Sequence, residues 1–155
     1  MSNADRVSVV IDFPNGNGDF NKISQEMHQV IDSGVDEIDL VVSNDARIAD
    51  KILEIADFIK IKLILETGKW SIDELIDICE IYQSYDNITH YKTSTGKLFN
   101  TDVSEKAKHI DIMKKYKSIK VSGGVNGVNI HTYDNIGVDI FGIGYKTIMD
   151  STIWE

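Results

Sequence analysis

The stretch His90-Tyr91-Lys92-Thr93-Ser94-Thr95-Gly96-Lys97 places a lysine inside a predicted buried strand that runs directly into a Ser/Thr/Gly turn. Burying a lysine is costly, because desolvation disfavours its charged form. A lysine that is buried and neutral is a nucleophile that can form a Schiff base with a carbonyl compound. The turn adds backbone N–H groups and the positive charge of Lys97, which suit a phosphate. The stretch therefore predicts carbonyl chemistry on a phosphorylated small molecule.

A strand followed by a turn and a helix is also the pattern on both sides of this stretch. Apolar, β-branched runs alternate with segments of helical periodicity, which is typical of parallel strands joined by helical crossovers. Strands are predicted at 6–14, 37–42, 62–68, 90–96, 119–125 and 138–144. Helices are predicted at 19–33, 43–59, 71–82, 129–137 and 145–154, with one more that begins at Thr101 or Ser104 and ends near 113. We therefore expect an α/β fold of six strand–helix units in one domain over residues 1–155.

Composition excludes several classes of function. The chain of 155 residues has a formal net charge of −9, which argues against a nucleic-acid partner, since phosphate backbones attract clustered basic residues. No apolar run approaches the roughly 20 residues of a membrane-spanning helix, and the N-terminus has no signal-peptide pattern. Cys79 is the only cysteine, so neither an internal disulfide nor a cysteine metal site is expected. These features predict a soluble, cytoplasmic protein with no membrane partner and no metal.

Three charged residues lie within otherwise apolar predicted strands: Asp39, Lys92 and Lys120. An aldolase that works through an imine needs a lysine to attack the carbonyl and a nearby cation to lower the pKa of that lysine. It also needs a carboxylate that moves protons between the intermediates. The three residues fit this set of roles, and in parallel α/β folds the strand ends that carry them converge on one face. The alternative is that each is a solvated or structurally paired charge at a strand edge.

Glycine turns follow three consecutive strands, at Gly96-Lys97, Gly123-Gly124 and Gly142-Ile143-Gly144. Glycine allows backbone N–H groups to approach an anion closely, and barrel enzymes often bind phosphate after their last strands. Each glycine could instead serve only to make a tight turn. The three together favour a phosphate site.

These motifs carry a resemblance to a known family. The stretch Lys92-Thr93-Ser94-Thr95-Gly96-Lys97 resembles deoxyribose-phosphate aldolase, and the resemblance runs from about Val7 to about Ile148. Four further segments match the pattern of the family: Asp36-Glu37-Ile38-Asp39, Lys120-Val121-Ser122-Gly123-Gly124-Val125, Leu65-Glu66-Thr67-Gly68 and Phe13-Pro14-Asn15-Gly16.

The resemblance implies a TIM-barrel fold and a class I aldolase without metal or cofactor. Such an enzyme reversibly cleaves 2-deoxy-D-ribose 5-phosphate to acetaldehyde and D-glyceraldehyde 3-phosphate. By motif, Lys92 would be the Schiff-base lysine, Lys120 the cation that lowers its pKa, and Asp39 the acid/base that works through water. The residues that would line the phosphate site are Gly96, Lys97, Gly123, Gly124 and Gly144.

The family barrel has eight strand–helix units, and this sequence begins at what matches the third. Asn126 stands where the family has a basic residue, and Gly144 and Tyr145 stand where it has serines. An open sheet of six strands would have two exposed edges, which are rarely left bare. We therefore expect a homo-oligomer, or a partner that supplies the missing strands. Two alternative functions follow: a catalytically weak or inactive aldolase-like remnant that acts as a binding or regulatory subunit, and a Schiff-base lyase that acts on another short aldehyde.

Three other residues have side chains that could carry chemistry: Cys79, His109 and Glu66. Cys79 lies on the apolar face of its helix and is expected to pack in the core. His109 is expected to be a solvated helix residue. Glu66, at a strand end, could belong to a polar layer inside the barrel or take a direct part in the site.

Overall fold

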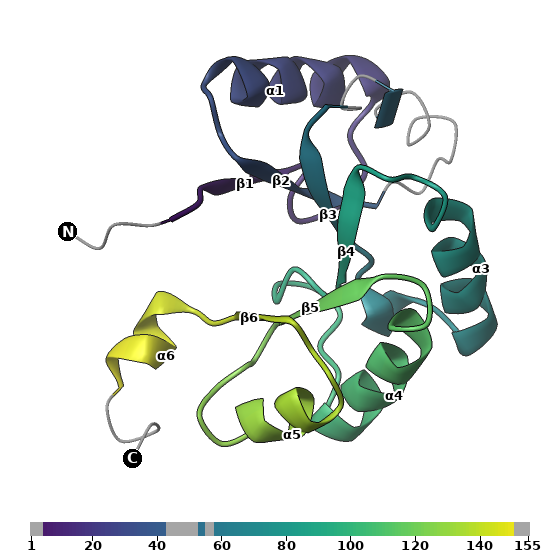
Figure 1. Cartoon of the computed structure of the whole chain (residues 1–155), viewed down its shortest axis with the longest axis vertical. Helices are drawn as coiled ribbons and strands as arrows, with labels where there is room; N and C mark the ends of the chain where they lie inside the picture. The colour runs from purple at the N-terminus through teal and green to yellow at the C-terminus, as the bar shows by residue number, and fades with distance from the viewer. Residues whose placement is uncertain (1–4, 43–52, 55–57, 151–155) are drawn as a thin grey trace.

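The computed structural model describes residues 5–42, 53–54 and 58–150, which form one six-stranded sheet with helices around it (Figure 1). All neighbouring strands are parallel, and their order in space is their order in the chain. The strands are β1 (Ser8–Ile11), β2 (Glu37–Val41), β3 (Lys60–Ile64), β4 (Ile88–Lys92), β5 (Ser118–Ser122) and β6 (Ile140–Gly142). The helices are α1 (Phe20–Asp32), the 3-10 helix η1 (Thr67–Lys69), α3 (Ile72–Tyr82), α4 (Val103–Met113), α5 (Ile130–Asn135) and α6 (Tyr145–Met149).

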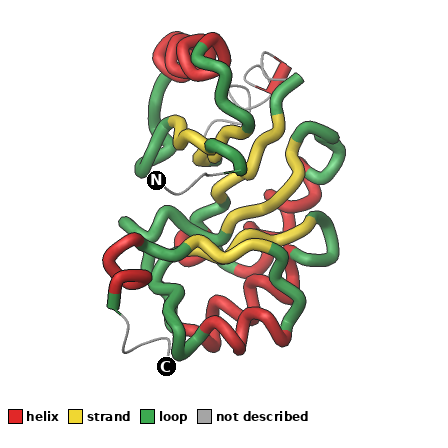
Figure 2. Tube along the Cα trace, turned by 60° about the vertical axis from the view of Figure 1, so that its left-hand side comes forward, coloured by secondary structure: helices red, strands yellow, loops and turns green. Residues whose placement is uncertain are grey.

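The sheet curls into part of a barrel, with helices α1, α3, α4 and α5 around its outer side (Figure 1). Figure 2 shows the same arrangement from another side, with the strands next to one another and most of the helices outside them. The prediction of a TIM-barrel-like α/β fold built from six parallel units is confirmed. In the described part of the chain, no helix is long and apolar enough to cross a membrane.

The alternation of side chains along the strands separates two faces of the sheet. Ile38 pairs in register with Ile61, and Tyr91 with Ile119, and all four side chains are buried in the core. The Tyr91 hydroxyl donates to the carbonyl of Cys79 in α3, which places this apolar face under the helices. Successive residues of a strand point to opposite faces. The charged residues between these apolar ones therefore point to the concave side.

Helix starts follow the capping rules. Asp19 accepts a hydrogen bond from the N–H of Lys22 and begins α1, as its position in the sequence predicts. Ser71 and Glu74 form the predicted capping box at the start of α3. The prediction for α4 was wrong by one or two residues, because Asp102 is the cap and accepts from the N–H of Glu105.

Several boundaries and one burial prediction differ from the structure. The strand β4 ends at Lys92 rather than at Gly96, and β3 begins two residues earlier than expected, at Lys60. His109 is 4% exposed and therefore not solvated, whereas Cys79 is buried as predicted. The buried residues of α4 are Lys106, His109, Ile110 and Met113, a spacing that puts His109 on the inner stripe of the helix. The helix predicted at 43–59 falls mostly outside the described residues.

Candidate active site

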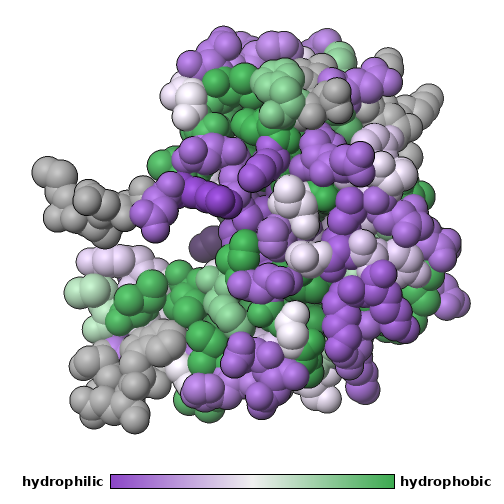
Figure 3. All heavy atoms as spheres, viewed as in Figure 1, coloured by the Kyte–Doolittle hydropathy of each residue, from purple (hydrophilic) through white to green (hydrophobic). Residues whose placement is uncertain are grey.

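A cavity of about 460 Å³ lies on the concave side of the sheet, at the carboxyl ends of β4, β5 and β6. Lys92 is the last residue of β4, and Gly123-Gly124 follows β5 directly. Seven of the eight predicted site residues line this cavity: Lys92, Gly96, Lys97, Lys120, Gly123, Gly124 and Gly144. Figure 3 shows a hollow on the left of the view, with hydrophilic residues above it and hydrophobic residues below.

The eighth residue, Asp39, holds the two lysines together. Its Oδ2 oxygen accepts a hydrogen bond of 2.9 Å from Lys92 Nζ and one of 2.7 Å from Lys120 Nζ. Lys92 and Lys120 are register partners on β4 and β5, and Asp39 projects from β2 across the concave face. The three strands therefore bring two amines to one carboxylate oxygen, and the Asp39 side chain is only 4% exposed.

A second layer of charges, which the sequence analysis missed, lies behind this triad. Lys62 is the register partner of Asp39 on β3, and its Nζ lies 4.0 Å from Asp39 Oδ1. The same amine forms an ion pair with Glu37, which also accepts from Arg6 at 3.2 Å. Ser8 Oγ donates to Asp39 Oδ1 at 2.7 Å. Because both carboxylate oxygens of Asp39 are engaged, its orientation is fixed.

The predicted strand begins at Lys62, and a lysine at the first position of a strand is commonly solvated. The strand begins two residues earlier, so Lys62 is central and buried. The alternation Lys60, Lys62 and Ile64 on one face could have indicated this, since Asp39 lies on the neighbouring strand. Charged residues at equivalent places of adjacent strands are the signal that the sequence offered.

Burial and neighbouring charge shift the pKa values of this cluster. Burial lowers the pKa of Lys92, and the charge of Lys120 lowers it further, while Asp39 opposes both. Burial alone would raise the pKa of Asp39, but the charge of Lys92 and hydrogen bonds from Lys120 and Ser8 outweigh it and hold that pKa below its ordinary value. Burial, together with the charges of Lys120, Arg6 and Lys92, lowers the pKa of Lys62 to about 8.

The two glycine turns beside the lysines touch each other backbone to backbone. A Cβ on Gly96 would lie 3.2 Å from the Cα of Gly123, and a Cβ on Gly123 would lie 2.4 Å from Ser94 Oγ. Both residues adopt positive φ angles, of 72° and 83°. The N–H of Thr95 donates to Glu66 Oε2 at 3.0 Å, which anchors the first turn to the polar layer. Only glycine satisfies this combination of backbone angle and close approach at position 123.

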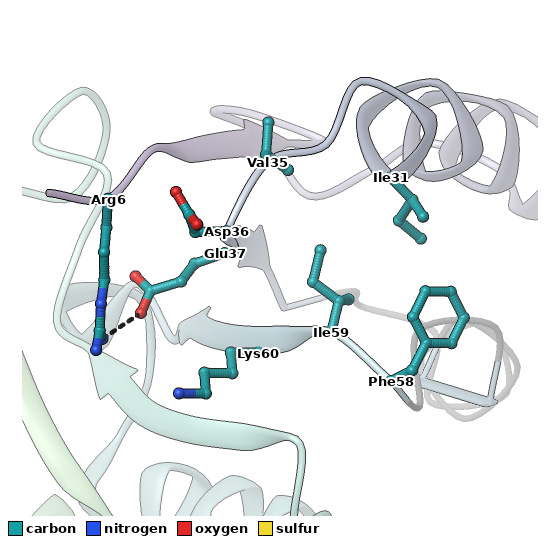
Figure 4. Close-up of a pocket in the computed structure, with 8 residues that line it drawn as sticks. All are labelled: Arg6, Ile31, Val35, Asp36, Glu37, Phe58, Ile59 and Lys60. Atoms are coloured by element: carbon teal, nitrogen blue, oxygen red, sulfur yellow. Dashed lines mark hydrogen bonds and ion pairs between the residues drawn. The ribbon is translucent and has the colours of Figure 1, made fainter. Parts of the chain in front are cut away.

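A different cavity, of about 380 Å³, lies at the opposite ends of the strands (Figure 4). It lies beside Glu37 and Lys60, the first residues of β2 and β3, and the Arg6–Glu37 ion pair crosses one side of it. None of the predicted site residues is among those that line it. In the described part of the chain, no group of three or more His, Cys, Asp or Glu side chains could hold a metal ion. The lysine cluster at the carboxyl ends is therefore the candidate active site.

The fold and this arrangement of strands define a partial TIM barrel, as comparison with solved structures confirms. The deoxyribose phosphate aldolase from Aeropyrum pernix, described as a unique tetramer, superposes with a TM-score of 0.82 at 23% identity, over 95% of this chain and 68% of that one. An aldolase named QR15 gives a TM-score of 0.72 at 23% identity, over 97% of this chain and 76% of that one. At these identities the likeness concerns the fold.

Sequence comparison finds curated relatives that carry one name. Deoxyribose-phosphate aldolase from Haloarcula marismortui is 29% identical over 128 residues, which cover 77% of this chain and 54% of that protein. The enzyme of the same name from Agrobacterium fabrum is 30% identical over 141 residues, which cover 79% of this chain and 53% of that protein. No family model matches the chain. The chain is a homologue of deoxyribose-phosphate aldolases, as the motifs predicted, and it spans about half the length of these curated relatives.

Proposed function

We propose that this chain is the reactive part of a class I aldolase in which Lys92 forms a Schiff base with an aldehyde substrate. The observation that carries the proposal is the shared Asp39 Oδ2 oxygen, which receives both Lys92 and Lys120 beside a cavity. An amine that is buried next to a second cation has a lowered pKa and so supplies more of its neutral, nucleophilic form. The homologous proteins carry the name of an enzyme of this kind.

The proposed reaction is the reversible cleavage of 2-deoxy-D-ribose 5-phosphate. Lys92 Nζ attacks C1 of the open-chain aldehyde, and loss of water from the carbinolamine gives a protonated imine. Loss of the proton of the C3 hydroxyl breaks the C2–C3 bond, whose electron pair passes into the imine to form an enamine. D-glyceraldehyde 3-phosphate leaves, the enamine takes a proton on carbon, and hydrolysis of the imine releases acetaldehyde. The protonated imine is the electron sink, so the scheme needs no cofactor.

Asp39 and Lys120 serve proton transfer and charge in this scheme. Asp39 exchanges protons with the intermediates through water, since it is the carboxylate in contact with the reacting amine. Burial and the charge of Lys120 lower the pKa of Lys92, which increases the fraction of its neutral form. The phosphate is proposed to lie against the turns that contain Gly96, Lys97, Gly123, Gly124 and Gly144. Backbone N–H groups and one lysine there match the charge of a phosphate monoester.

The test is borohydride trapping. The protein is incubated with acetaldehyde or with 2-deoxy-D-ribose 5-phosphate, reduced, digested and analysed by mass spectrometry. We expect one adduct, on Lys92, and none in Lys92→Met. The matched control is Lys108→Met, which removes an exposed lysine of α4 and should trap as the wild type does. A folded protein without an adduct on Lys92 would refute the proposal.

The second candidate function is that of a binding or regulatory subunit with weak or no turnover. The chain spans about half the length of each curated relative. Substrate binding without a trapped adduct would support this candidate. A lyase that takes another short aldehyde, the third possibility, would trap that aldehyde and discriminate against the phosphorylated sugar.

We also propose that residues 1–155 act as one domain and that it associates through its sheet edges. In the sheet of six described strands, β1 and β6 are the edge strands, and exposed apolar side chains lie near them, at Val7, Val10, Tyr145 and Ile148. Open parallel edges are normally covered. The covering element is a second copy or a partner that contributes further strands.

A further inference from the structure

A buried lysine outside the catalytic cluster contacts the end of β5. Lys106, on α4, is 4% exposed, and its Nζ donates to the carbonyl oxygens of Ser122 at 2.9 Å and Gly123 at 2.6 Å. Burial lowers the pKa of Lys106, and the charge of Glu66 opposes this shift. Burying an ammonium group is costly, so two carbonyl contacts at one strand end indicate a specific task for it.

The Ser122 carbonyl receives more hydrogen bonds than an ordinary backbone acceptor. Thr93 Oγ1 donates to it at 3.0 Å and Ser94 Oγ at 2.9 Å, in addition to the Lys106 ammonium. Both hydroxyls belong to the turn after β4, so the two glycine turns and α4 meet at this single oxygen. A carbonyl held by three donors, one of them charged, cannot rotate without loss of all three contacts.

Fixing these carbonyls also fixes the amides that follow them. In a trans peptide the N–H points opposite to the C=O of the same unit. The Ser122 and Gly123 carbonyls both point to Lys106 Nζ, so the N–H groups of Gly123 and Gly124 point away from it. Both glycines line the cavity and have positive φ angles. Two successive N–H groups on one side of a turn form a concave anion site. A cation that contacts the carbonyl oxygens of the same peptide units polarises them and strengthens their N–H groups as donors.

We propose that Lys106 is a positioning residue that turns the N–H groups of Gly123 and Gly124 toward the phosphate of the substrate. The inference rests on the proposed function, because it assigns these amides to the phosphate end of the same cavity. The Lys106 ammonium acts from behind the turn, through the backbone, and does not touch the ligand. Asn126, which also lines the cavity, is uncharged, whereas Lys97 lines the cavity and Lys106 lies behind the Gly123-Gly124 turn.

Glu66 supports this arrangement from the neighbouring turn. Its carboxylate accepts the Thr95 N–H at 3.0 Å, and its charge favours the ammonium form of Lys106. Its other oxygen, Oε1, is buried and has no hydrogen-bond partner among the described residues. The carboxylate therefore opposes the loss of the Lys106 proton that burial favours.

The first measurement uses the unmodified protein. Titration with inorganic phosphate, followed by amide NMR, should shift the Gly123 and Gly124 resonances more than those of Gly34 and Gly137, which have positive φ angles away from the cavity. Unchanged Gly123 and Gly124 signals at saturating phosphate would overturn the proposal. This outcome does not depend on any variant folding.

The second measurement isolates Lys106. In Lys106→Met, the phosphate Kd and the KM for 2-deoxy-D-ribose 5-phosphate should each rise about 10-fold, the loss expected for a charge-assisted contact. The rate of acetaldehyde trapping on Lys92 should stay within about twofold, because acetaldehyde carries no phosphate. Lys106→Arg, which keeps the cation, should recover part of the affinity, and Lys108→Met should match the wild type.

The outcomes separate this inference from the proposed function. Loss of trapping and of phosphate affinity together in Lys106→Met would mean that Lys106 only maintains the fold, which overturns its positioning role. Unchanged phosphate affinity in a folded Lys106→Met also overturns it. If the wild type binds phosphate at Gly123 and Gly124 but never traps acetaldehyde, the aldolase proposal fails while the anion site stands.

Discussion

Lys92 and Lys120 are register partners on adjacent parallel strands, so two lysine side chains leave the sheet side by side and end on the same oxygen of Asp39. Cations at this separation would repel each other strongly without the shared carboxylate. Loss of a proton from one of the two lysines therefore removes the repulsion between their ammonium groups. Lys92 is the more buried of the two and is the one that the proposed chemistry deprotonates.

Removing Lys120 should move the pH profile of the reaction. In Lys120→Leu the pKa of Lys92 rises, because a neighbouring positive charge is lost, and the neutral fraction at pH 7 falls about tenfold for each unit of that rise. Measured as the rate of acetaldehyde trapping against pH, the midpoint should move upward and the rates should converge in base. Lys120→Arg keeps the charge and should keep the midpoint. Equal slowing by both variants, with no movement of the midpoint, would contradict the electrostatic role.

Replacing Asp39 should cost stability in a way that depends on pH. Asp39→Asn leaves buried lysines without their counter-charge and should lower the unfolding free energy by about 3–5 kcal/mol near pH 7. The pKa of Asp39 is lowered in the fold, so its contribution is complete above the unfolded value of 3.8 and disappears as the pH falls through the folded value. Urea unfolding from pH 7 downward should therefore show the two proteins converging in acid. A constant difference would mean that the charge of Asp39 is not what stabilises the cluster.

The lowered pKa of Lys62 should make the unfolding free energy depend on pH in the alkaline range. Its pKa of about 8 lies below its ordinary value of 10.5, so between these values the unfolded chain binds more protons and stability rises with pH. Lys62→Met lacks this titration. Its unfolding free energy relative to the wild type should be constant below pH 8 and fall as the pH approaches 10.5. Lys60→Met, which removes the exposed lysine at the first position of the same strand, is the matched control.

Two adjacent glycines offer a matched pair of substitutions. Gly123→Ala would place a Cβ 2.4 Å from Ser94 Oγ, whereas Gly124→Ala meets nothing within 4 Å. Both positions have positive φ angles, so both variants share a backbone strain of about 1–3 kcal/mol. Thermal unfolding should show a larger loss for Gly123→Ala, and the excess measures the steric contact alone. Equal losses would show that the turn yields easily at Ser94.

The sheet edges predict association. Light scattering after size exclusion should give a mass above that of one chain, because two parallel edges with nearby apolar side chains would otherwise stay open to water. Charged substitutions at Val10 and Ile148 should shift the species toward monomer. A single-chain mass at micromolar concentration would contradict the prediction.

The sequence predicted the fold where local chemistry and periodicity agreed. The Ser71–Glu74 capping box and the Asp19 cap were both placed correctly, because each depends only on residues within one helical turn. The start of α4 was predicted at Thr101 or Ser104, whereas the cap is Asp102, whose side chain accepts from the N–H of Glu105. The prediction that His109 is solvated was wrong, because an isolated polar residue does not indicate which face of a helix is covered.

The structure brings three of the predicted residues together, but the sequence did not indicate the charged residues that surround them. Lys92, Lys120 and Asp39 stand out as charges within apolar strands, and the structure brings them within hydrogen-bond distance. Lys62 could not be placed, since register across β2 and β3 decides that it faces Asp39. Lys106 could not be found either, because a lysine on an amphipathic helix is usually solvated and its carbonyl partners lie 16 and 17 residues away. Tertiary contacts of this kind leave no local pattern.

The order of the strands determines the order in which the contacts of Asp39 can form while the chain is synthesised. Because strand order in space follows chain order, the N-terminal half can pair as it emerges from the ribosome. Asp39 emerges 53 residues before Lys92 and 81 residues before Lys120. Until then, Lys62 and Ser8 are the partners available to its carboxylate. The carboxylate of Asp39 therefore gains its first hydrogen-bonded lysine, Lys92, with the fourth strand and its second, Lys120, with the fifth.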